Sequence, residues 1–478
     1  MSLAGQMKRL IRHSAVYGVG GLVSRILAVL LLPLYTRYLS KADYGAIETL
    51  IALTTVLVIV LRAGISSAFF RFYFDASDDE GRNLVVRTSF WFTMTSATAG
   101  LVLGLVFAPQ LAGLLNGVTA NLVRAAIVGV WAQMNYEQLT SLFRVEERSV
   151  AFALSSLANV VITVAATVLL VAVLHEGAVG VLVGNFVGTL IVYLVLLGYR
   201  RYQLGLQFGR ELFREMNRFG IPLVPAALAL WTVNFVDRVL LNKIAGAGEL
   251  GLYSLGVRVS SVVLFIFLAF RTAWPAFAYS IEDDDEARRT YGFVLTYLLL
   301  LCCWVSLALG LLAPWLVRLL AAKPEFYPAS RVVAPLAFGT AAYAAYVVVS
   351  IGVSRARYTQ FNWVVTGAGA ILNVVLNVIL IPPYGMMGAA VATVAAYTLM
   401  FVGMTLNAQR VYQVPYQWRR VTTLVAAAVG LTVLGKVVDA SLPVALALSA
   451  AYPLVLLPLG FYLPSELRPL RRVLPASR

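Results

Sequence analysis

Long apolar segments recur along nearly the whole chain and decide what it can fold into. Runs of about 18 to 28 residues alternate with short connectors that carry charge, proline or glycine, and fourteen such runs can be counted in 478 residues. A helix needs about 20 mostly apolar residues to cross a bilayer. Only 12% of the residues are charged, against roughly 25% in a soluble protein. The sequence therefore predicts an all-α polytopic membrane protein with about 14 transmembrane helices.

The connectors are too short for a separate catalytic domain. None exceeds about 20 residues, so we expect any function to reside among the helices and predict no enzyme. Cys302 and Cys303 are adjacent inside one apolar run, and His13 and His175 lie far apart in sequence. This spacing favours neither a disulfide nor a metal site, and we predict no cofactor.

The basic residues follow the predicted topology. With the N-terminus inside, the even connectors and both termini hold 24 of the 37 lysines and arginines, the odd connectors hold 7 and the spans hold 6. This asymmetry obeys the positive-inside rule. It predicts cytoplasmic termini, and it explains the net charge of +15 by topology and anionic headgroups rather than by nucleic acid.

An internal repeat appears at an offset of about 206 to 208 residues. LYTRYLSKADYGAI (34–47) aligns with LLNKIAGAGELGLY (240–253), which matches Gly45 to Gly251. EGAVGVLVGNFVGTL (176–190) aligns with YGMMGAAVATVAAYTL (384–399), which matches Gly177 to Gly385. Two matches at nearly one offset indicate duplication of a six-helix unit. Because six is even, both copies enter the membrane in the same direction, and we predict a parallel repeat that can rock to expose a central cavity to either side.

The repeat predicts the domain organisation. Residues 1–202 form an N-lobe with helices one to six, 203–218 an interfacial linker helix, and 219–412 a C-lobe with helices seven to twelve. The linker carries apolar residues at helical spacing beside arginines, as an interfacial helix does. Residues 413–478 add two further helices and a tail that have no counterpart in the repeat.

Arginines inside the apolar runs are the candidate substrate-binding residues. In the first run Arg25 shares a small, polar face with Tyr17 and Ser24, and it lies about 16 Å into the helix. In the eighth run Arg258 shares a face with serines, whereas Arg271 points elsewhere near the cytoplasmic end. Arg271 and Arg62 are each compatible with a cavity position or with snorkelling to the headgroups. Arg124 is close to the outer end of its helix, where an interfacial role is favoured.

The seventh run combines opposite charges. Asn234 and Arg238 share a face, and Asp237 precedes the arginine. Two interpretations stay open: a pair that neutralises itself, or a titratable Asp237 that couples transport to an ion gradient. Glu137 is a second candidate for ion coupling.

Two polar stripes occupy equivalent places in the repeat. Asn373 and Asn377 belong to the stripe of helix eleven, and Asn159 belongs to that of helix five. Hydrogen bonds between packed helices are one interpretation, and contacts to sugar hydroxyls through Tyr17, Ser24, Asn234, Asn373 and Asn377 are the other.

The spans contain more arginine than acid. Six arginines stand against Glu48, Glu137 and Asp237. A guanidinium remains charged when desolvated and binds phosphate oxygens with two parallel donors. A cationic cavity therefore indicates an anionic substrate such as a phosphate or diphosphate.

Several segments resemble a known family. LPLYTRYLSKADYGAIETL (32–50), ISSAFFRFYF (65–74), FRVEERSVAFALSSLANV (143–160) and FGIPLVPAALALWTVNFVDR (219–238) are similar to the polysaccharide branch of the multidrug/oligosaccharidyl-lipid/polysaccharide (MOP) exporter superfamily, and most of all to Wzx-type oligosaccharide flippases. The resemblance implies a MATE-like fold of two six-helix lobes in a V, with two added helices. It also implies alternating-access movement of an undecaprenyl-diphosphate-linked oligosaccharide from the cytoplasmic to the outer leaflet of a bacterial inner membrane, for polysaccharide biosynthesis.

The resemblance further implies which residues and partners are involved. Related lipid II flippases place arginines of helices one, two and eight near the pyrophosphate, and Arg25, Arg62 and Arg258 match them by position; Arg62 departs from the pattern in its spacing from Gly64. The implied partners are the lipid-linked oligosaccharide, membrane lipids and other polysaccharide-assembly proteins of the membrane. Three rival classes stay open: a MATE-like drug or cation antiporter, which favours an acidic cavity, a membrane glycan polymerase or ligase, which favours a large outer loop, and a structural partner of an assembly complex.

Overall fold

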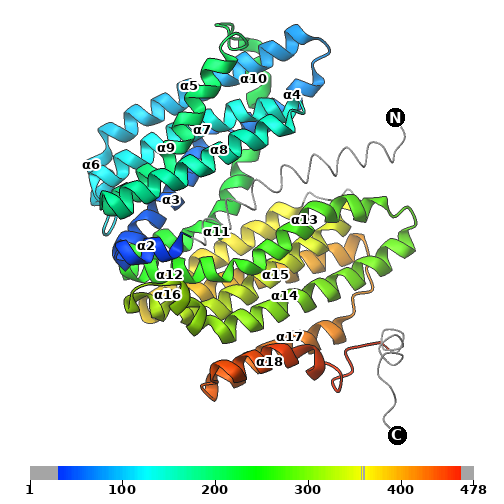
Figure 1. Ribbon diagram of the computed structural model, residues 1–478. Helices are drawn as coiled ribbons and strands as arrows, with labels where there is room; N and C mark the ends of the chain where they lie inside the picture. Colours follow the sequence, from blue (N-terminus) through cyan, green and yellow to red (C-terminus); the bar gives the residue numbers. More distant parts are fainter. Residues whose placement is uncertain (1–30, 357, 359–360, 464–478) are drawn as a thin grey trace. The chain divides into compact units, whose positions relative to one another are not determined.

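The described chain is built from helices and their connectors. The computed structural model describes residues 31–356, 358 and 361–463, without some side chains of the helix that spans Val262–Ser280, and these ranges contain no strand (Figure 1). Nine helical segments in them are long and apolar enough to cross a membrane. The all-helical polytopic fold is thus confirmed, while the first predicted run lies outside the described residues.

The first part of the described chain, up to residue 260, contains eleven α-helices. Their bounds are α2 (Leu32–Tyr38), α3 (Lys41–Arg62), α4 (Ile65–Asp75), α5 (Asp79–Val106), α6 (Ala108–Gly113), α7 (Ala120–Val145), α8 (Ser149–Val168) with a π-turn at Leu169–Val173, α9 (Gly177–Arg200), α10 (Arg210–Gly220), a 3-10 turn at Ile221–Leu223, α11 (Val224–Ala245) and α12 (Ala247–Ser260).

The remaining helices include α14 and α16, the two longest of the described chain. They are α13 (Val262–Ser280), α14 (Asp284–Leu320), a 3-10 turn at Pro324–Ala329, α15 (Ser330–Arg355), α16 (Asn362–Val411), α17 (Trp418–Val437) and α18 (Leu442–Val455). The 50 residues of α16 contain two predicted spans, and the backbone leaves helical geometry between them at Gly385, with φ 53° and ψ −130°.

Local sequence explains where α3 begins and ends. Ser40 precedes it and accepts a hydrogen bond from the Asp43 amide at 3.1 Å, while Asp43 accepts one from the Ser40 amide at 3.1 Å. This reciprocal cap satisfies amides that the first turn leaves without partners. At the other end Ala63 and Gly64 have φ of 46° and 76°. Glycine tolerates this left-handed geometry, so the chain turns sharply into α4.

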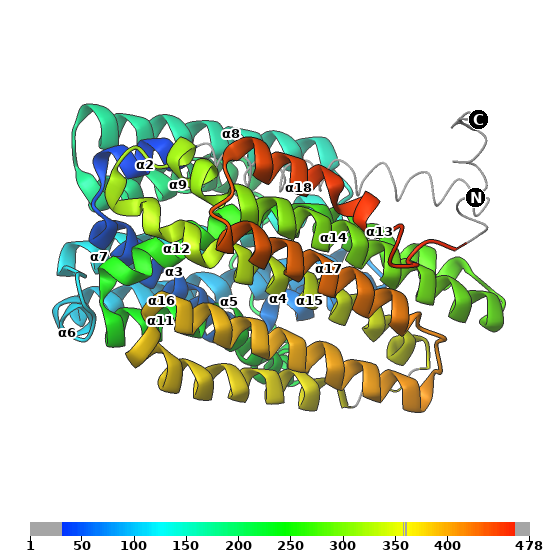
Figure 2. The same ribbon diagram turned by 90° about the horizontal axis from the view of Figure 1, so that it is seen from below.

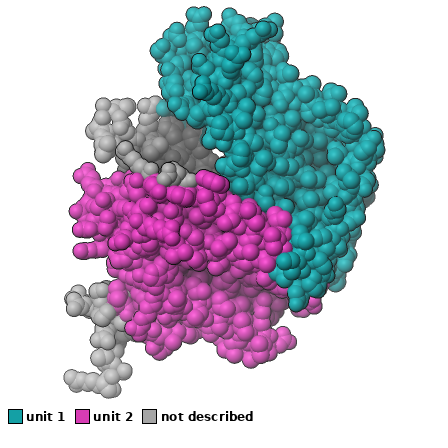
Figure 3. Space-filling model, turned by 180° about the vertical axis from the view of Figure 1, so that it is seen from behind, with its two compact units in different colours: residues 1–254, 320–326, 377–386 teal, residues 255–319, 327–376, 387–478 magenta. Residues whose placement is uncertain are grey.

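The structure divides into two compact units, coloured separately in Figure 3. Unit 1 comprises residues 1–254, 320–326 and 377–386, and unit 2 comprises 255–319, 327–376 and 387–478. These units group helices by contact, whereas the lobes were predicted from the repeat, so the predicted boundaries at 202, 219 and 413 stay a prediction. Unit 1 differs from the N-lobe because it also contains α11, most of α12 and two connectors of the C-lobe.

In unit 1 the linker helix α10 packs on the core of α4, α5, α7 and α9. Met216 is fully buried, and Leu212, Phe213 and Phe219 pack against the same core. The arginines at 210, 214 and 218 are exposed. One apolar and one basic face is the pattern of an interfacial helix.

In unit 2 the two last helices lie side by side (Figures 1 and 2). The Tyr452 hydroxyl on α18 donates to the Leu424 carbonyl on α17 at 2.8 Å, and the Trp304 indole on α14 donates to the Ser449 carbonyl at 2.7 Å. Hydrogen bonds of this kind hold helices together where apolar surface alone gives little selectivity.

The repeat is visible in backbone geometry. Gly177 and Gly385, which the sequence pairs, have φ of 55° and 53°. Both lie at an odd connector, where a predicted span ends and the next begins. Equivalent positions therefore share an unusual conformation that side-chain-bearing residues rarely adopt.

Candidate functional site

A buried group of charged and polar residues joins α3 to α11 and α12 inside unit 1. This α3–α11 cluster consists of Glu48, Asp237, Arg238 and Tyr253. A carboxylate oxygen of Glu48 lies 3.8 Å from Nε of Arg238, and their side chains are only 8% and 11% exposed. Both side chains come from helices with the length and hydropathy of membrane spans, where an ionisable residue marks a functional site by default.

Asp237 is held from several directions. Its Oδ1 accepts a hydrogen bond from the Arg238 amide at 2.8 Å and lies 3.8 Å from Nη1 of Arg238, and its Oδ2 accepts one from the Tyr253 hydroxyl. Arg238 also donates to the Asn234 carbonyl and lies 4.7 Å from the centroid of Phe235. The cluster therefore contains a paired Asp237 and Arg238 together with Glu48 from another helix, and both interpretations of Asp237 stay open.

A second ion pair lies at the other end of α3. Nη2 of Arg62 is 2.7 Å from Oε2 of Glu137 on α7, with side chains 18% and 40% exposed. Oε1 of Glu137 accepts from the Gln133 side chain at 2.8 Å. Arg62 and Glu137, predicted for substrate binding and ion coupling, are thus brought together as partners of each other.

Three further arginines of the spans differ in exposure. Arg258 is half-buried in the last turn of α12, where its carbonyl accepts from the Ser261 hydroxyl at 2.6 Å. Arg271 on α13 is exposed, and Arg124 on α7 is exposed and donates to Asn121 at 3.0 Å. Exposure on an apolar helix fits the interfacial role predicted for Arg124.

The polar candidates divide into three groups. Asn234 is half-buried and donates to the Leu230 carbonyl at 2.6 Å. Asn373 and Asn377 on α16 are fully buried at 0% exposure, so any sugar contact needs a conformation that uncovers them. Tyr17, Ser24 and Arg25 lie outside the described residues.

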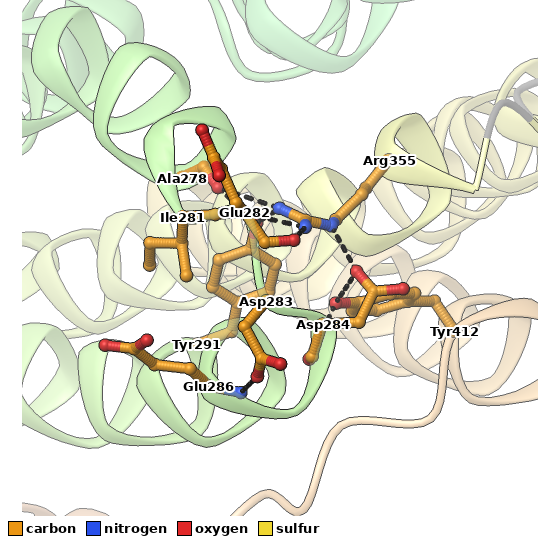
Figure 4. A network of polar contacts seen from close by, with 9 residues as sticks. All are labelled: Ala278, Ile281, Glu282, Asp283, Asp284, Glu286, Tyr291, Arg355 and Tyr412. Carbon is orange, nitrogen blue, oxygen red and sulfur yellow. Dashed lines mark hydrogen bonds and ion pairs between the residues drawn. The ribbon is translucent and has the colours of Figure 1, made fainter.

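In unit 2 a network of contacts around one arginine connects the ends of four helices (Figure 4). Arg355, at the end of α15, donates to Asp284 at 2.8 Å, to the carbonyls of Ala278, Ile281 and Glu282 at 3.2, 2.9 and 3.3 Å, and to the Tyr291 hydroxyl at 3.2 Å. The Tyr412 hydroxyl donates to the same carboxylate at 3.2 Å. Burial raises the pKa of Tyr412 above its ordinary value, so this hydroxyl is protonated at neutral pH. The guanidinium fork thereby fixes the turn between α13 and α14.

Sequence reasoning noted Glu48 only as one of three acids and assigned no role to Tyr253 or Arg355. Glu48 had a usable signal, since it is a carboxylate inside an apolar run. Tyr253 and Arg355 had no such signal in the sequence, because their partners come from other helices. Helical periodicity does not show which helices are neighbours.

Two family models match the chain. That of the polysaccharide biosynthesis protein family matches residues 10–281, and that of the MatE family matches residues 222–379. Among curated proteins, an Lsg locus protein of Haemophilus influenzae is 24% identical over 279 residues, which are 55% of this chain and 65% of the relative. The match thus spans slightly less than two-thirds of that relative's own length.

Solved structures show a similar fold. The lipid II flippase MurJ in an inward closed conformation has a TM-score of 0.74 at 14% identity and covers 93% of this chain and 99% of its own. An inward-facing multidrug resistance MATE family transporter of the MOP superfamily has a TM-score of 0.62 at 15% identity, covering 81% and 97%. At such identities the likeness concerns the fold.

Proposed function

This chain belongs to the polysaccharide biosynthesis protein family of the MOP superfamily of membrane transporters, and we propose that it is a flippase for a lipid-linked oligosaccharide. The substrate is an undecaprenyl-diphosphate glycan, moved from the cytoplasmic to the outer leaflet for polysaccharide biosynthesis. Its sugars pass among the helices while the lipid tail stays in the bilayer. The protein acts in a bacterial cytoplasmic membrane with both termini inside.

The observation that carries this proposal is the extent of the family match. Residues 10–281 include all four arginines predicted to bind the diphosphate: Arg25, Arg62, Arg238 and Arg258. A buried guanidinium is costly in an apolar helix, and Arg238 is only 11% exposed. Phosphate oxygens suit the two-pronged geometry of arginine. Asp237 and Glu137, which already bind arginines here, are the candidates for ion coupling.

Export of glycan by defined variants tests the proposal. Arg25→Ala and Arg258→Ala are expected to abolish surface polysaccharide while protein level and insertion stay normal. Arg124→Ala is the matched control, because Arg124 is an exposed arginine inside the same family match. Mass spectrometry of lipids that copurify with the wild-type protein is expected to find a polyprenyl-diphosphate glycan. Wild-type export by both variants contradicts the assignment of the arginines.

The MatE match over residues 222–379 favours one second candidate, an antiporter for drugs or cations. Such a transporter attracts its substrate with acidic groups. It predicts cation efflux driven by an ion gradient, with no glycan lipid bound. Resistance of cells to cationic drugs, measured with and without the protein, separates the two functions.

A further inference from the structure

The connector between α9 and α10 presents apolar side chains on the surface of unit 1. Leu206 is 88% exposed and Tyr202 80%, and Phe208 is exposed as well. Leu204, which lies between them in sequence, is buried in the core formed by α4, α5, α7 and α9. One side of the connector is thus fixed to the protein, while the other side leaves apolar surface exposed.

Side chains of α5 hold the backbone of this connector. Three hydrogen bonds join the two segments: Arg87 guanidinium to Gln203 carbonyl (3.2 Å), Trp91 indole to Gly205 carbonyl (3.1 Å) and Gly209 amide to Thr88 hydroxyl (3.1 Å). Irregular backbone at membrane depth is tolerated only where other protein groups or water satisfy it. Because α5 provides these partners, the connector can lie at a depth where water is scarce.

The same hydrogen bonds place the connector along α5 rather than beyond its end. The 28 residues of α5 span about 42 Å, against about 30 Å of hydrocarbon. With its outer end at the far edge of the hydrocarbon, α5 extends about 12 Å beyond it on the cytoplasmic side. Arg87 and Trp91 lie about 12 and 18 Å from that cytoplasmic end. The connector therefore lies where the headgroups of the inner leaflet meet the acyl chains.

A second copy of this connector is covered by protein. YQLGLQF (202–208) aligns at an offset of 210 with YQVPYQW (412–418), the connector between α16 and α17, so the repeat continues a few residues past the predicted six-helix unit. Tyr412 and Tyr416, at the first and fifth positions of the second copy, are only 5% and 8% exposed. The same two positions of the first copy are the most exposed ones of the connector. Within the described chain they do not have the cover of their counterparts, which indicates that a partner outside the chain buries them.

The charge around the connector indicates the nature of this partner. Between residues 200 and 218 five arginines stand against two glutamates, and the topology predicted from charge places this connector on the cytoplasmic side. Arg201 and Arg210 flank the apolar residues, and both side chains are exposed. Exposed arginines beside aromatic and apolar side chains suit the boundary of a leaflet that contains acidic phospholipids.

We propose that residues 201–209 are a membrane anchor: Leu206 inserts among the acyl chains of the inner leaflet, and Arg201 and Arg210 bind the headgroup of an acidic phospholipid. The apolar face of α10 does not serve this purpose, because it packs on the core of unit 1. The anchor fixes the depth of unit 1 in the cytoplasmic leaflet. It is independent of the transport function proposed above and of the transported substrate.

Fluorescence quenching in lipid nanodiscs tests the depth of the anchor, since both faces of a nanodisc are open to solvent. Leu206→Cys in a Cys302→Ala, Cys303→Ala background carries a bimane label. A phosphatidylcholine with a nitroxide near the glycerol end of its acyl chain is expected to quench this label strongly. Aqueous iodide is expected to quench it about threefold or more weakly than a label at Glu80→Cys, because an apolar side chain at the headgroup boundary is shielded from water.

Glu80 is the matched position, because it is exposed in the first turn of α5 on the same side of the membrane. Equal quenching by iodide at positions 206 and 80 would place the connector in water, where a soluble protein could cover it instead. That result overturns the anchor.

Exchanging the quencher lipid tests the headgroup. At the same low mole fraction and at low salt, nitroxide phosphatidylglycerol is expected to quench the label at position 206 about threefold or more strongly than nitroxide phosphatidylcholine. Adding Arg201→Gln and Arg210→Gln together is expected to make the two lipids equal, and high salt is expected to reduce the difference. Arg124→Gln, which removes an exposed arginine near the start of α7, is the control and is expected to keep the difference. Equal quenching by both lipids in the parent protein, or a preference that the double variant leaves unchanged, overturns the binding of acidic phospholipid by these arginines.

Discussion

The Glu48 carboxylate on α3 lies 3.8 Å from the Arg238 guanidinium on α11, and both side chains are almost completely buried. Glu48 follows Gly45 by one helical turn, and a Cβ atom on Gly45 would lie 1.8 Å from the Ala247 carbonyl oxygen, so the ion pair lies beside a close contact of α3 with α12. Arg238 is also one of the arginines proposed to bind diphosphate. If Arg238 binds diphosphate as proposed, Glu48 and the substrate compete for one guanidinium.

Removing the charge of Glu48 tests this competition. Glu48→Gln is expected to lower the free energy of unfolding by about 1–3 kcal/mol, because a buried charged partner of Arg238 is lost while Asp237 remains. If Arg238 binds diphosphate, the same variant is expected to bind an isoprenyl diphosphate more tightly. Thermal unfolding and ligand binding in detergent measure the two effects. Glu80→Gln, which changes an exposed acid at the start of α5, is the control for the binding assay.

The pair of Arg62 and Glu137 allows a different measurement. Arg62→Ala and Glu137→Ala, alone and together, form a double-mutant cycle. Because Glu137 is 40% exposed, a coupling free energy of only about 0.5–1 kcal/mol is expected. If Arg62 also binds substrate, the double variant remains defective in export although its stability recovers in part. Restored export in the double variant would show that Arg62 serves only to neutralise Glu137.

Arg355 is expected to stabilise unit 2 without contacting substrate. Arg355→Ala leaves the carbonyls of Ala278, Ile281 and Glu282 without their donor (Figure 4). A loss of about 2 kcal/mol in the free energy of unfolding follows from several such hydrogen bonds. Arg355→Lys is expected to recover little of it, since an ammonium cannot reproduce the guanidinium fork. Arg289→Ala, at an exposed position of α14, is expected to change the melting temperature little, and an equal drop in both alanine variants would contradict the role of Arg355.

In this protein the sequence predicts the helices better than it predicts the contacts between them. Hydropathy and charge identify the helical membrane class, and the repeat pairs Gly45 with Gly251 and Gly177 with Gly385. A repeat shows that two positions are equivalent, but it does not show whether they touch. For the same reason helical periodicity placed Arg62 on α3 and left its pairing with Glu137 on α7 unknown. The turn around Arg355 is held by hydrogen bonds between segments that are far apart in sequence. No local sequence pattern predicts such contacts.

Gly64 provides the last prediction, at the joint between the end of α3 and the linker. Its φ is 76°, and a Cβ there would lie 2.1 Å from the Gly220 carbonyl oxygen, where α10 continues toward α11. Gly64→Ala therefore combines a left-handed residue with a backbone overlap, and a loss of about 2–4 kcal/mol is expected. Gly113→Ala is the control, because nothing lies within 4 Å of its Cβ position, and alanine favours the helix by up to about 1 kcal/mol. Thermal unfolding in detergent compares them. If Gly64→Ala melts no lower than Gly113→Ala, the joint is not the tight backbone contact described here, and α10 is free to shift against the break between α3 and α4.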